Sequence, residues 1–184
     1  TACDTIDIVY GDMQYDESKT PKYTFQRYKV TYSCERSKLP DKSAPPLPGN
    51  KFPPINAFAV YKTKVIWDET GSNWKNPRTD GNNATYEKQL VADYIEDLVF
   101  LPIDDEGKLI NPPPTVNNAT KDKLYKIKTV DIALSIRSTK KFYRSDKDRT
   151  KFTLNNPLRK KTRNDKYFRE TIVVTAHARN MGTL

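Results

Sequence analysis

The chain has 184 residues, of which 36% are hydrophobic and 30% charged, and its formal net charge is +9. This length suits one domain with a buried core, so we expect residues 1–184 to form a single globular domain. No apolar run approaches the roughly 18 residues that a membrane-spanning helix needs. One histidine and two cysteines are too few for a zinc site with several His or Cys ligands, and no catalytic motif is present. We therefore expect no metal, no cofactor and no enzymatic activity.

The first two predicted elements are strands with alternating apolar residues, at residues 5–10 and 23–32. A polar, turn-rich segment separates them, so we expect an antiparallel hairpin. Matching their apolar faces places Ile6 opposite Tyr32.

Cys3 lies just before the first of these strands and Cys34 just after the second. A regular ladder in this register would point the two side chains to opposite faces, so a disulfide requires a bulge or a Cys3 that lies outside the strand. We expect the disulfide, which for a loop of this size contributes about 3–4 kcal/mol. It implies an oxidising, extracytoplasmic compartment, and two free thiols in a cytosolic protein are the alternative.

The middle of the chain predicts a proline-rich surface loop at residues 39–54 and a strand at residues 57–67. Residues 84–97 show the spacing of a short helix, which a buried strand follows at residues 98–102. The acidic turn 104–107 ends that strand, with glycine at its strained position. The residues on the predicted helical face are Leu90, Val91, Tyr94 and Ile95.

Two long strands are predicted near the end, at residues 124–137 and 168–179. The expected fold class is therefore α+β but mostly antiparallel β, with one main sheet and one short helix. Such a sheet needs apolar cover on its far face, and no helix in this sequence supplies it. The apolar residues that alternate along the first of the two strands are Val130, Ile132, Leu134 and Ile136.

Positive charge is concentrated in residues 121–169, which hold 17 Lys or Arg and five Asp, a net charge of +12, while the rest of the chain carries −3. Such a stretch suits an acidic protein surface, nucleic acid or anionic lipid. Its aromatic residues suit base stacking, although in a β-protein they more often face the core. A solvated loop that keeps the protein soluble is the alternative.

Several segments taken together carry a resemblance to a known family. Residues 89–100 and the acidic turn 104–107 resemble the helix, buried strand and acidic turn of large type IV pilin-like proteins. Residues 130–138 look like the following strand of that family. Residues 166–180 are similar to the closing strand of PilW-type minor pilins, which commonly finish on an Arg-Asn pair. The opening residues 4–10, after a cysteine, also fit the start of that family's globular domain.

The resemblance implies a pilin-like globular domain whose long N-terminal helix lies outside this sequence. Loss of that helix would expose the sheet face that lacks a partner. The implied function is that of a minor pilin, which packs with other minor pilins and the major pilin to initiate or cap a type IV pilus. Such a protein is anchored in the inner membrane, facing the periplasm, before assembly and lies at the pilus tip afterwards.

In such an assembly the basic stretch would meet an acidic subunit, and charge complementarity would set the choice of partner. Two other functions of a pilin-like subunit remain open: a minor pseudopilin of a type II secretion system, and a surface pilin that binds DNA or another polyanion through the same stretch. A secreted β-domain enzyme is a third alternative, against which the lack of a converging acid–base set argues. The residues expected to form the contact surface are Arg144, Arg149, Arg159, Lys160, Lys161 and Arg163.

Overall fold

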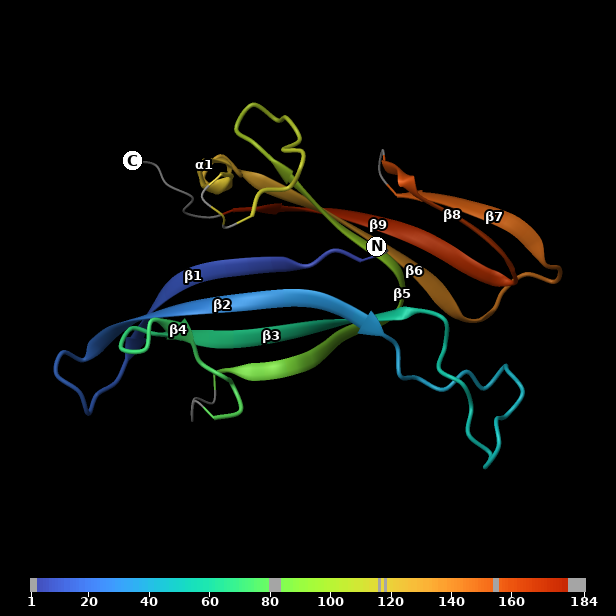
Figure 1. Ribbon diagram of the computed structural model, residues 1–184, viewed down its shortest axis with the longest axis horizontal. Helices are drawn as coiled ribbons and strands as arrows, with labels where there is room; N and C mark the ends of the chain where they lie inside the picture. The colour runs from blue at the N-terminus through green and yellow to red at the C-terminus, as the bar shows by residue number, and fades with distance from the viewer. Residues whose placement is uncertain (1–2, 80–83, 116, 118, 154–155, 179–184) are drawn as a thin grey trace. The chain divides into compact units, whose positions relative to one another are not determined.

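The structure is a computed structural model that describes residues 3–79, 84–115, 117, 119–153 and 156–178, without the side chains of 149–153 and 156–161 (Figure 1). The described chain is mostly antiparallel β, with nine strands and a single turn of helix. None of its helical residues forms a segment long and apolar enough to cross a bilayer. The elements are β1 (Ile6–Tyr15), β2 (Tyr23–Arg36), β3 (Phe58–Asp68), β4 (Asn73–Trp74), β5 (Tyr86–Ile103), α1 (Lys121–Leu124), β6 (Thr129–Lys141), β7 (Lys147–Thr153), β8 (Asn156–Asp165) and β9 (Tyr167–His177).

The main sheet has the strand order β1-β2-β3-β5-β6-β9, with the short β4 paired to β3, and β7 and β8 form a separate two-stranded ribbon. The chain divides into two compact units, one of residues 5–93 and one of residues 94–184 together with residues 1–4. Strand β5 begins in the first unit and ends in the second. The expectation that residues 1–184 form one domain stays a prediction.

The unit of residues 5–93 is built on the predicted hairpin. The register Ile6 opposite Tyr32 is confirmed, and the pairing continues to Tyr15 opposite Tyr23. Tyr28, at 1% exposure, is one of the most buried side chains of the unit. The hairpin forms because apolar and β-branched residues alternate on both strands, which lets one face pack while the other stays in water.

The short helix predicted at residues 84–97 is wrong, because Tyr86–Ile103 form strand β5. Lys88 and Tyr94 have positive φ angles, and the pairing with β6 shifts register between Ile95 and Asp97. These irregularities break the period of two, so the apolar residues fall at spacings that mimic a helix. The helix that the described residues do contain is the four-residue α1.

The acidic turn at residues 104–107 is confirmed. Gly107 has a φ of +78°, in the region that favours glycine. The N–H of Asp104 donates to the carbonyl of Lys108 at 2.9 Å, and its Oδ1 accepts the N–H groups of Glu106 and Lys108 at 3.0 and 2.8 Å. The Asp104 carboxylate therefore stabilises the turn itself.

The predicted disulfide between Cys3 and Cys34 is present, and neither cysteine is free. Cys3 lies outside β1, in an isolated parallel bridge with Leu98, and the N–H of Asp4 donates to the carbonyl of Leu98 at 2.8 Å. A regular hairpin would point the two cysteine side chains to opposite faces. Because Cys3 lies outside β1, as one of the two expected solutions required, this restriction does not apply to it.

In the second unit, β5, β6 and β9 pair so that one face is apolar and the other largely polar. On β6, the buried residues belong to the largely polar face, here called the second face. Ala133, Ser135 and Arg137 on this face are 0%, 4% and 8% exposed. Ile132 and Leu134, on the apolar face, are only half-buried. We call this apolar face the open face. Leu98, opposite Leu134 on the same face, is buried at 4% exposure. The partly or fully exposed residues of the face used below are Phe100, Ile132, Leu134, Ile172 and Val174.

Candidate functional site

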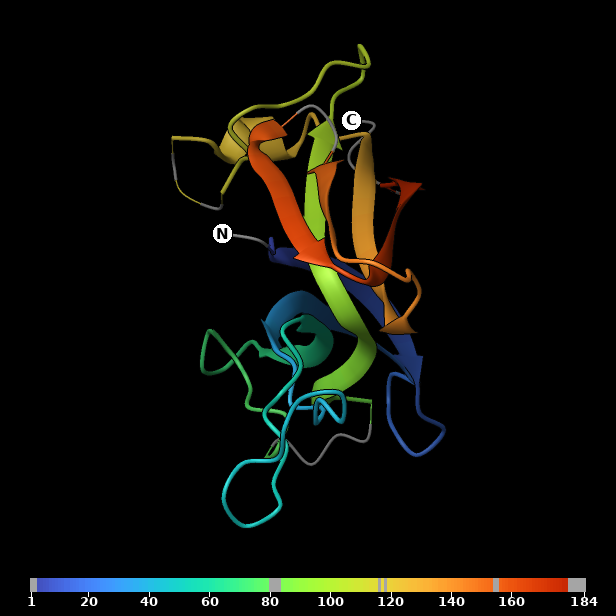
Figure 2. The same ribbon diagram turned by 90° about the vertical axis from the view of Figure 1, so that its right-hand side faces the viewer.

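The contact residues predicted from sequence fall on the β7–β8 ribbon and on the segment before it. Arg144 precedes β7 and is exposed, whereas Arg163, near the end of β8, is half-buried. Figures 1 and 2 both show the ribbon beside the part of the sheet formed by β5, β6 and β9. The other four predicted residues, whose side chains lie outside the described ones, are Arg149, Arg159, Lys160 and Lys161.

The ribbon brings cationic positions opposite each other. Its register pairs Arg149 with Arg163 and Lys151 with Lys161. Like charges directly opposite each other on neighbouring strands destabilise the pairing. These opposed cationic positions are the feature of the ribbon that would suit an acidic surface or a polyanion.

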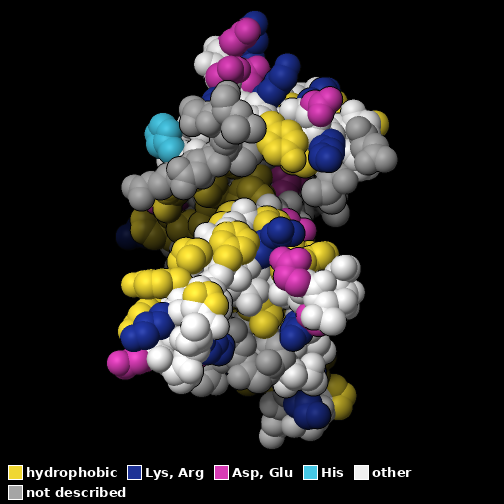
Figure 3. All heavy atoms as spheres, turned by 90° about the vertical axis from the view of Figure 1, so that its left-hand side faces the viewer, with side chains coloured by type: hydrophobic (Ala, Val, Ile, Leu, Met, Phe, Trp, Pro, Cys, Tyr) yellow, Lys and Arg dark blue, Asp and Glu magenta, His cyan; other side chains and the backbone are white. Residues whose placement is uncertain are grey.

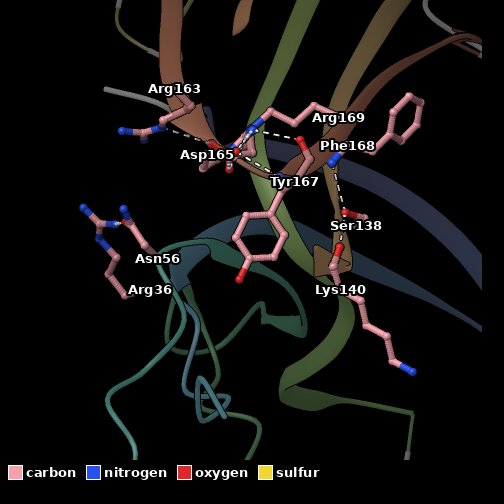
Figure 4. Close-up of polar contacts among 10 residues, drawn as sticks. Arg36, Asn56, Ser138, Lys140, Arg163, Asp165, Tyr167, Phe168 and Arg169 are labelled. Carbon is pink, nitrogen blue, oxygen red and sulfur yellow. Dashed lines mark hydrogen bonds and ion pairs between the residues drawn. The ribbon is translucent and has the colours of Figure 1, made fainter. Parts of the chain in front are cut away.

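A partly buried group of ion pairs, here called the anchor cluster, holds the base of the ribbon to the sheet. Arg169 of β9 donates from Nη1 to Asp165 Oδ1 at 2.8 Å and from Nη2 to Asp165 Oδ2 at 2.6 Å. Its Nε and Nη2 each lie 3.2 Å from Glu96 Oε1 on β5. Arg163 joins through its Nε, 3.7 Å from Glu96 Oε2. Figure 4 shows Arg163, Asp165 and Arg169 converging at this point.

The electrostatics of the cluster favour the charged forms of Asp165 and Arg169. The hydrogen bonds from Arg169 lower the pKa of Asp165, and the hydrogen bond to Asp165 raises the pKa of Arg169. The side chains of Arg169 and Glu96 are 6% and 8% exposed, and buried charges are tolerated only where they are paired and hydrogen-bonded. The cluster therefore fixes the start of β9 to the end of β8.

Next to the anchor cluster, Arg137 of β6 lies close to two aromatic rings. Its Cζ is 4.3 Å from the ring centroid of Tyr167 and 5.9 Å from that of Tyr94. Its buried Nε has no hydrogen-bond partner among the described residues. Cation–π contacts therefore take part in holding this buried charge.

Sequence reasoning missed the anchor cluster. Glu96 lay in the predicted helix, and Asp165 and Arg169 were counted only as charges of the basic stretch. No local spacing joins them, because Glu96 and Arg169 are 73 residues apart and meet only through the sheet. Of the predicted contact residues with described side chains, Arg163 is brought into the cluster.

A second exposed surface lies on the β1–β2 hairpin, in the unit of residues 5–93. It consists of Met13, Tyr15, Tyr23 and Phe25, which are 56–61% exposed, and we call it the hairpin patch. The register pairs Tyr15 with Tyr23 and Met13 with Phe25, so the four side chains share one face. Figure 3, which looks from the side where the β1–β2 turn lies in Figure 1, shows hydrophobic side chains at the surface. Contiguous exposed apolar patches mark interaction sites.

The described residues contain no group of three or more His, Cys, Asp or Glu side chains placed to hold a metal ion. His177 is exposed at the end of β9, opposite Thr129. What these surfaces offer is apolar area and positive charge, which suit macromolecular partners. No family model, curated protein or solved structure matches the chain.

Proposed function

We propose that the chain is the globular part of a type IV minor pilin of the PilW type. In this role it is an assembly subunit that packs with other minor pilins and the major pilin to initiate or cap a pilus. The observation that carries the proposal is the open face of β5, β6 and β9. It is an apolar sheet face whose residues on β9, Ile172 and Val174, are exposed, on an antiparallel sheet of the kind that the resemblance to pilin-like proteins implies.

The energetics of the open face support a long apolar helix as its cover. Ile172 and Val174 are 45% and 55% exposed. Burying an Ile or Val side chain contributes about 1.5–3 kcal/mol relative to full exposure. A helix lying over the open face would gain the part of this term that belongs to the area still exposed, mainly that of Ile172 and Val174, without any polar contact. The N-terminal helix of a pilin supplies such a cover and, in this proposal, anchors the subunit in the inner membrane before assembly.

The disulfide between Cys3 and Cys34 supports the compartment that the proposal requires, because disulfides persist in oxidising, extracytoplasmic environments. In this proposal the subunit is held in the periplasm before assembly and lies at the pilus tip afterwards. A minor pseudopilin of a type II secretion system would share the same compartment and the same need for a helix over the sheet.

The experiment compares two matched substitutions in the full-length native protein, expressed in its host. Ile172→Glu places a charge on the open face, and Ile8→Glu places the same charge on β1, where the isoleucine is 44% exposed against 45% for Ile172. We expect Ile172→Glu to lower the amount of subunit in sheared pili and the number of pili seen by electron microscopy. Ile8→Glu is expected to leave both near the parent level.

Circular dichroism melts of the 184-residue chain show whether both variants fold. Equal effects of the two substitutions on piliation, or normal piliation with Ile172→Glu, would count against a helix packed on the open face.

A second function, capture of a polyanion such as DNA, is favoured by the register of the β7–β8 ribbon. Arg149 opposite Arg163 and Lys151 opposite Lys161 give an array of cationic positions on two strands. Phosphate oxygens at the spacing of a nucleic acid backbone would meet several of these cations at once. This function is compatible with a pilus subunit.

A further inference from the structure

Strand β9 is an open edge of the main sheet. It is last in the strand order, and among the described strands only β6 pairs with it. Residues 172–177 are exposed whichever face they lie on, and Ile172, Val173 and Val174 are 45%, 46% and 55% exposed. Side chains on both faces of the edge are thus accessible.

The usual protection of an edge strand is missing from this segment. Edge strands normally carry charges, proline or bulges that prevent pairing with another chain. Residues 171–176, Thr-Ile-Val-Val-Thr-Ala, contain none of these and combine β-branched residues with zero charge. The opposite edge strand, β1, differs, because Asp7 and Asp12 lie within it.

The hydrogen-bond pattern shows which backbone groups face the open edge. The N–H of Ala178 donates to the carbonyl of Lys128 at 2.9 Å, so this opposed pair is hydrogen-bonded. In an antiparallel ladder, hydrogen-bonded and non-hydrogen-bonded pairs alternate, and the β6–β9 register is regular from Thr129 to Arg137. The even-numbered residues of β9 therefore bond to β6. Thr171, Val173 and Thr175 present their N–H and C=O groups at the open edge.

We infer that β9 pairs antiparallel with the β9 strand of a second copy of the chain. Since residues 171–176 carry no charge, they meet their own copy without opposed like charges. In the register centred on Val173, each Thr171 lies opposite a Thr175 and each Ile172 opposite a Val174. The odd-numbered residues then form the hydrogen-bonded pairs, which uses the outward N–H and C=O groups of both copies.

This register keeps the two copies in one continuous sheet. Opposed residues have the same parity, so they point to the same side, and the open faces of the two copies become neighbours on that side. The interface is isologous, because the same strand serves both copies around a two-fold axis. The pairing therefore closes at two copies and leaves no new open edge at β9.

The charge of the chain sets the salt dependence of this pairing. Two copies with a net charge of +9 each repel one another, and salt screens the repulsion. Association between copies is therefore expected to strengthen as the salt concentration rises. Binding of an acidic strand from another protein would weaken as the salt concentration rises. The direction of the salt dependence therefore distinguishes a second copy of the chain from an acidic partner at this edge.

The first experiment measures sedimentation equilibrium of the 184-residue chain at low and high NaCl, with two variants at one position. Val173→Pro removes an N–H that makes no bond to β6, and Val173→Thr keeps that N–H in a residue suited to strands. We expect a monomer–dimer equilibrium that tightens with salt. Val173→Pro should weaken it by about tenfold or more, since each dimer loses two hydrogen bonds, while Val173→Thr changes it little.

The second experiment needs no substitution and does not depend on how a proline variant folds. Amide hydrogen exchange, read by NMR, compares dilute and concentrated samples. We expect the amides of Thr171, Val173 and Thr175 to gain protection on concentration, while those of Ile172 and Val174 are protected in both samples. A chain that stays monomeric at every salt concentration, or a dimer in which the odd-numbered amides exchange freely, would overturn the inference.

Discussion

The guanidinium carbon of Arg137 lies 4.3 Å from the ring centroid of Tyr167, and the two residues are 8% and 9% exposed. A buried cation is costly unless something replaces its hydration, and the Nε of Arg137 has no hydrogen-bond partner among the described residues. The negative face of the tyrosine ring offsets part of that cost. The start of β9 is thus held by aromatic packing as well as by the anchor cluster.

The first prediction concerns this contact. Tyr167→Leu removes the ring and leaves Arg137 with less compensation, so we expect it to lower the free energy of unfolding by about 1–3 kcal/mol in urea denaturation. Tyr125→Leu is the matched control, because Tyr125 is 63% exposed, and its expected effect is within about 0.5 kcal/mol. Similar losses for the two variants would contradict the role given to Tyr167.

The second prediction concerns the pH dependence of the anchor cluster. Because Arg169 lowers the folded-state pKa of Asp165, the contribution of Asp165 is fully present above its unfolded-state pKa of about 3.9. It is lost as the pH falls through the lower folded-state pKa. Asp165→Asn should lower the free energy of unfolding by about 2–3 kcal/mol at pH 7 and flatten its dependence on pH below about 4.

Asp16→Asn is the control for this pH experiment. Hydrogen bonds from Ser18 also lower the pKa of Asp16, but this carboxylate lies at the surface, in the turn after β1. Its substitution should change the acid limb of the stability curve less than Asp165→Asn does. Parallel acid limbs for the parent chain and Asp165→Asn would show that the anchor cluster does not set the acid sensitivity.

The third prediction concerns the disulfide. Reduction opens the loop between Cys3 and Cys34 and enlarges the unfolded ensemble, so we expect the free energy of unfolding to fall by about 3–4 kcal/mol. Urea denaturation with and without reductant measures this difference. The variant with serine at both positions should be insensitive to reductant, and equal midpoints for the oxidised and reduced parent chain would exclude a stabilising role.

The fourth prediction tests polyanion binding by the ribbon. The logarithm of duplex DNA affinity should fall linearly with the logarithm of salt concentration, with a slope of about −0.9 for each phosphate contact. Reversing the charges of Arg149, Lys160 and Lys161 to Glu should weaken binding and reduce the slope. The control reverses Lys22, Lys42 and Lys51, which are exposed in the other unit and give the same change in net charge. Equal weakening by both sets would show a nonspecific charge effect.

Local patterns predicted the first hairpin because its register follows from alternation alone. Matching apolar faces was enough to place Ile6 opposite Tyr32. The same reasoning failed for β5, where Lys88 and Tyr94 have positive φ angles and interrupt the alternation. The residue types at these two positions did not indicate positive φ angles, since neither position is a glycine.

Alternation also separated the two faces of β6 correctly but did not indicate which face is buried. An observer of the sequence would expect Leu134 to be buried and Arg137 to be in water, and the described structure buries Arg137 more deeply. The difference arises because Glu96, Asp165 and Tyr167, distant in sequence, meet on the second face. Such long-range pairing of charges leaves no periodic signal.

The close approach of Phe25 to Gly11 affects how the hairpin patch meets another molecule. A Cβ built at Gly11 would lie 2.3 Å from Cε2 and Cζ of the Phe25 ring, so any larger residue at position 11 would displace the ring. With glycine there, the ring lies close to Gly11 on the neighbouring strand although Phe25 is 61% exposed. An exposed aromatic group that already packs against the neighbouring strand loses less rotational freedom on contact than one surrounded by water. The hairpin patch is in this sense preorganised for binding.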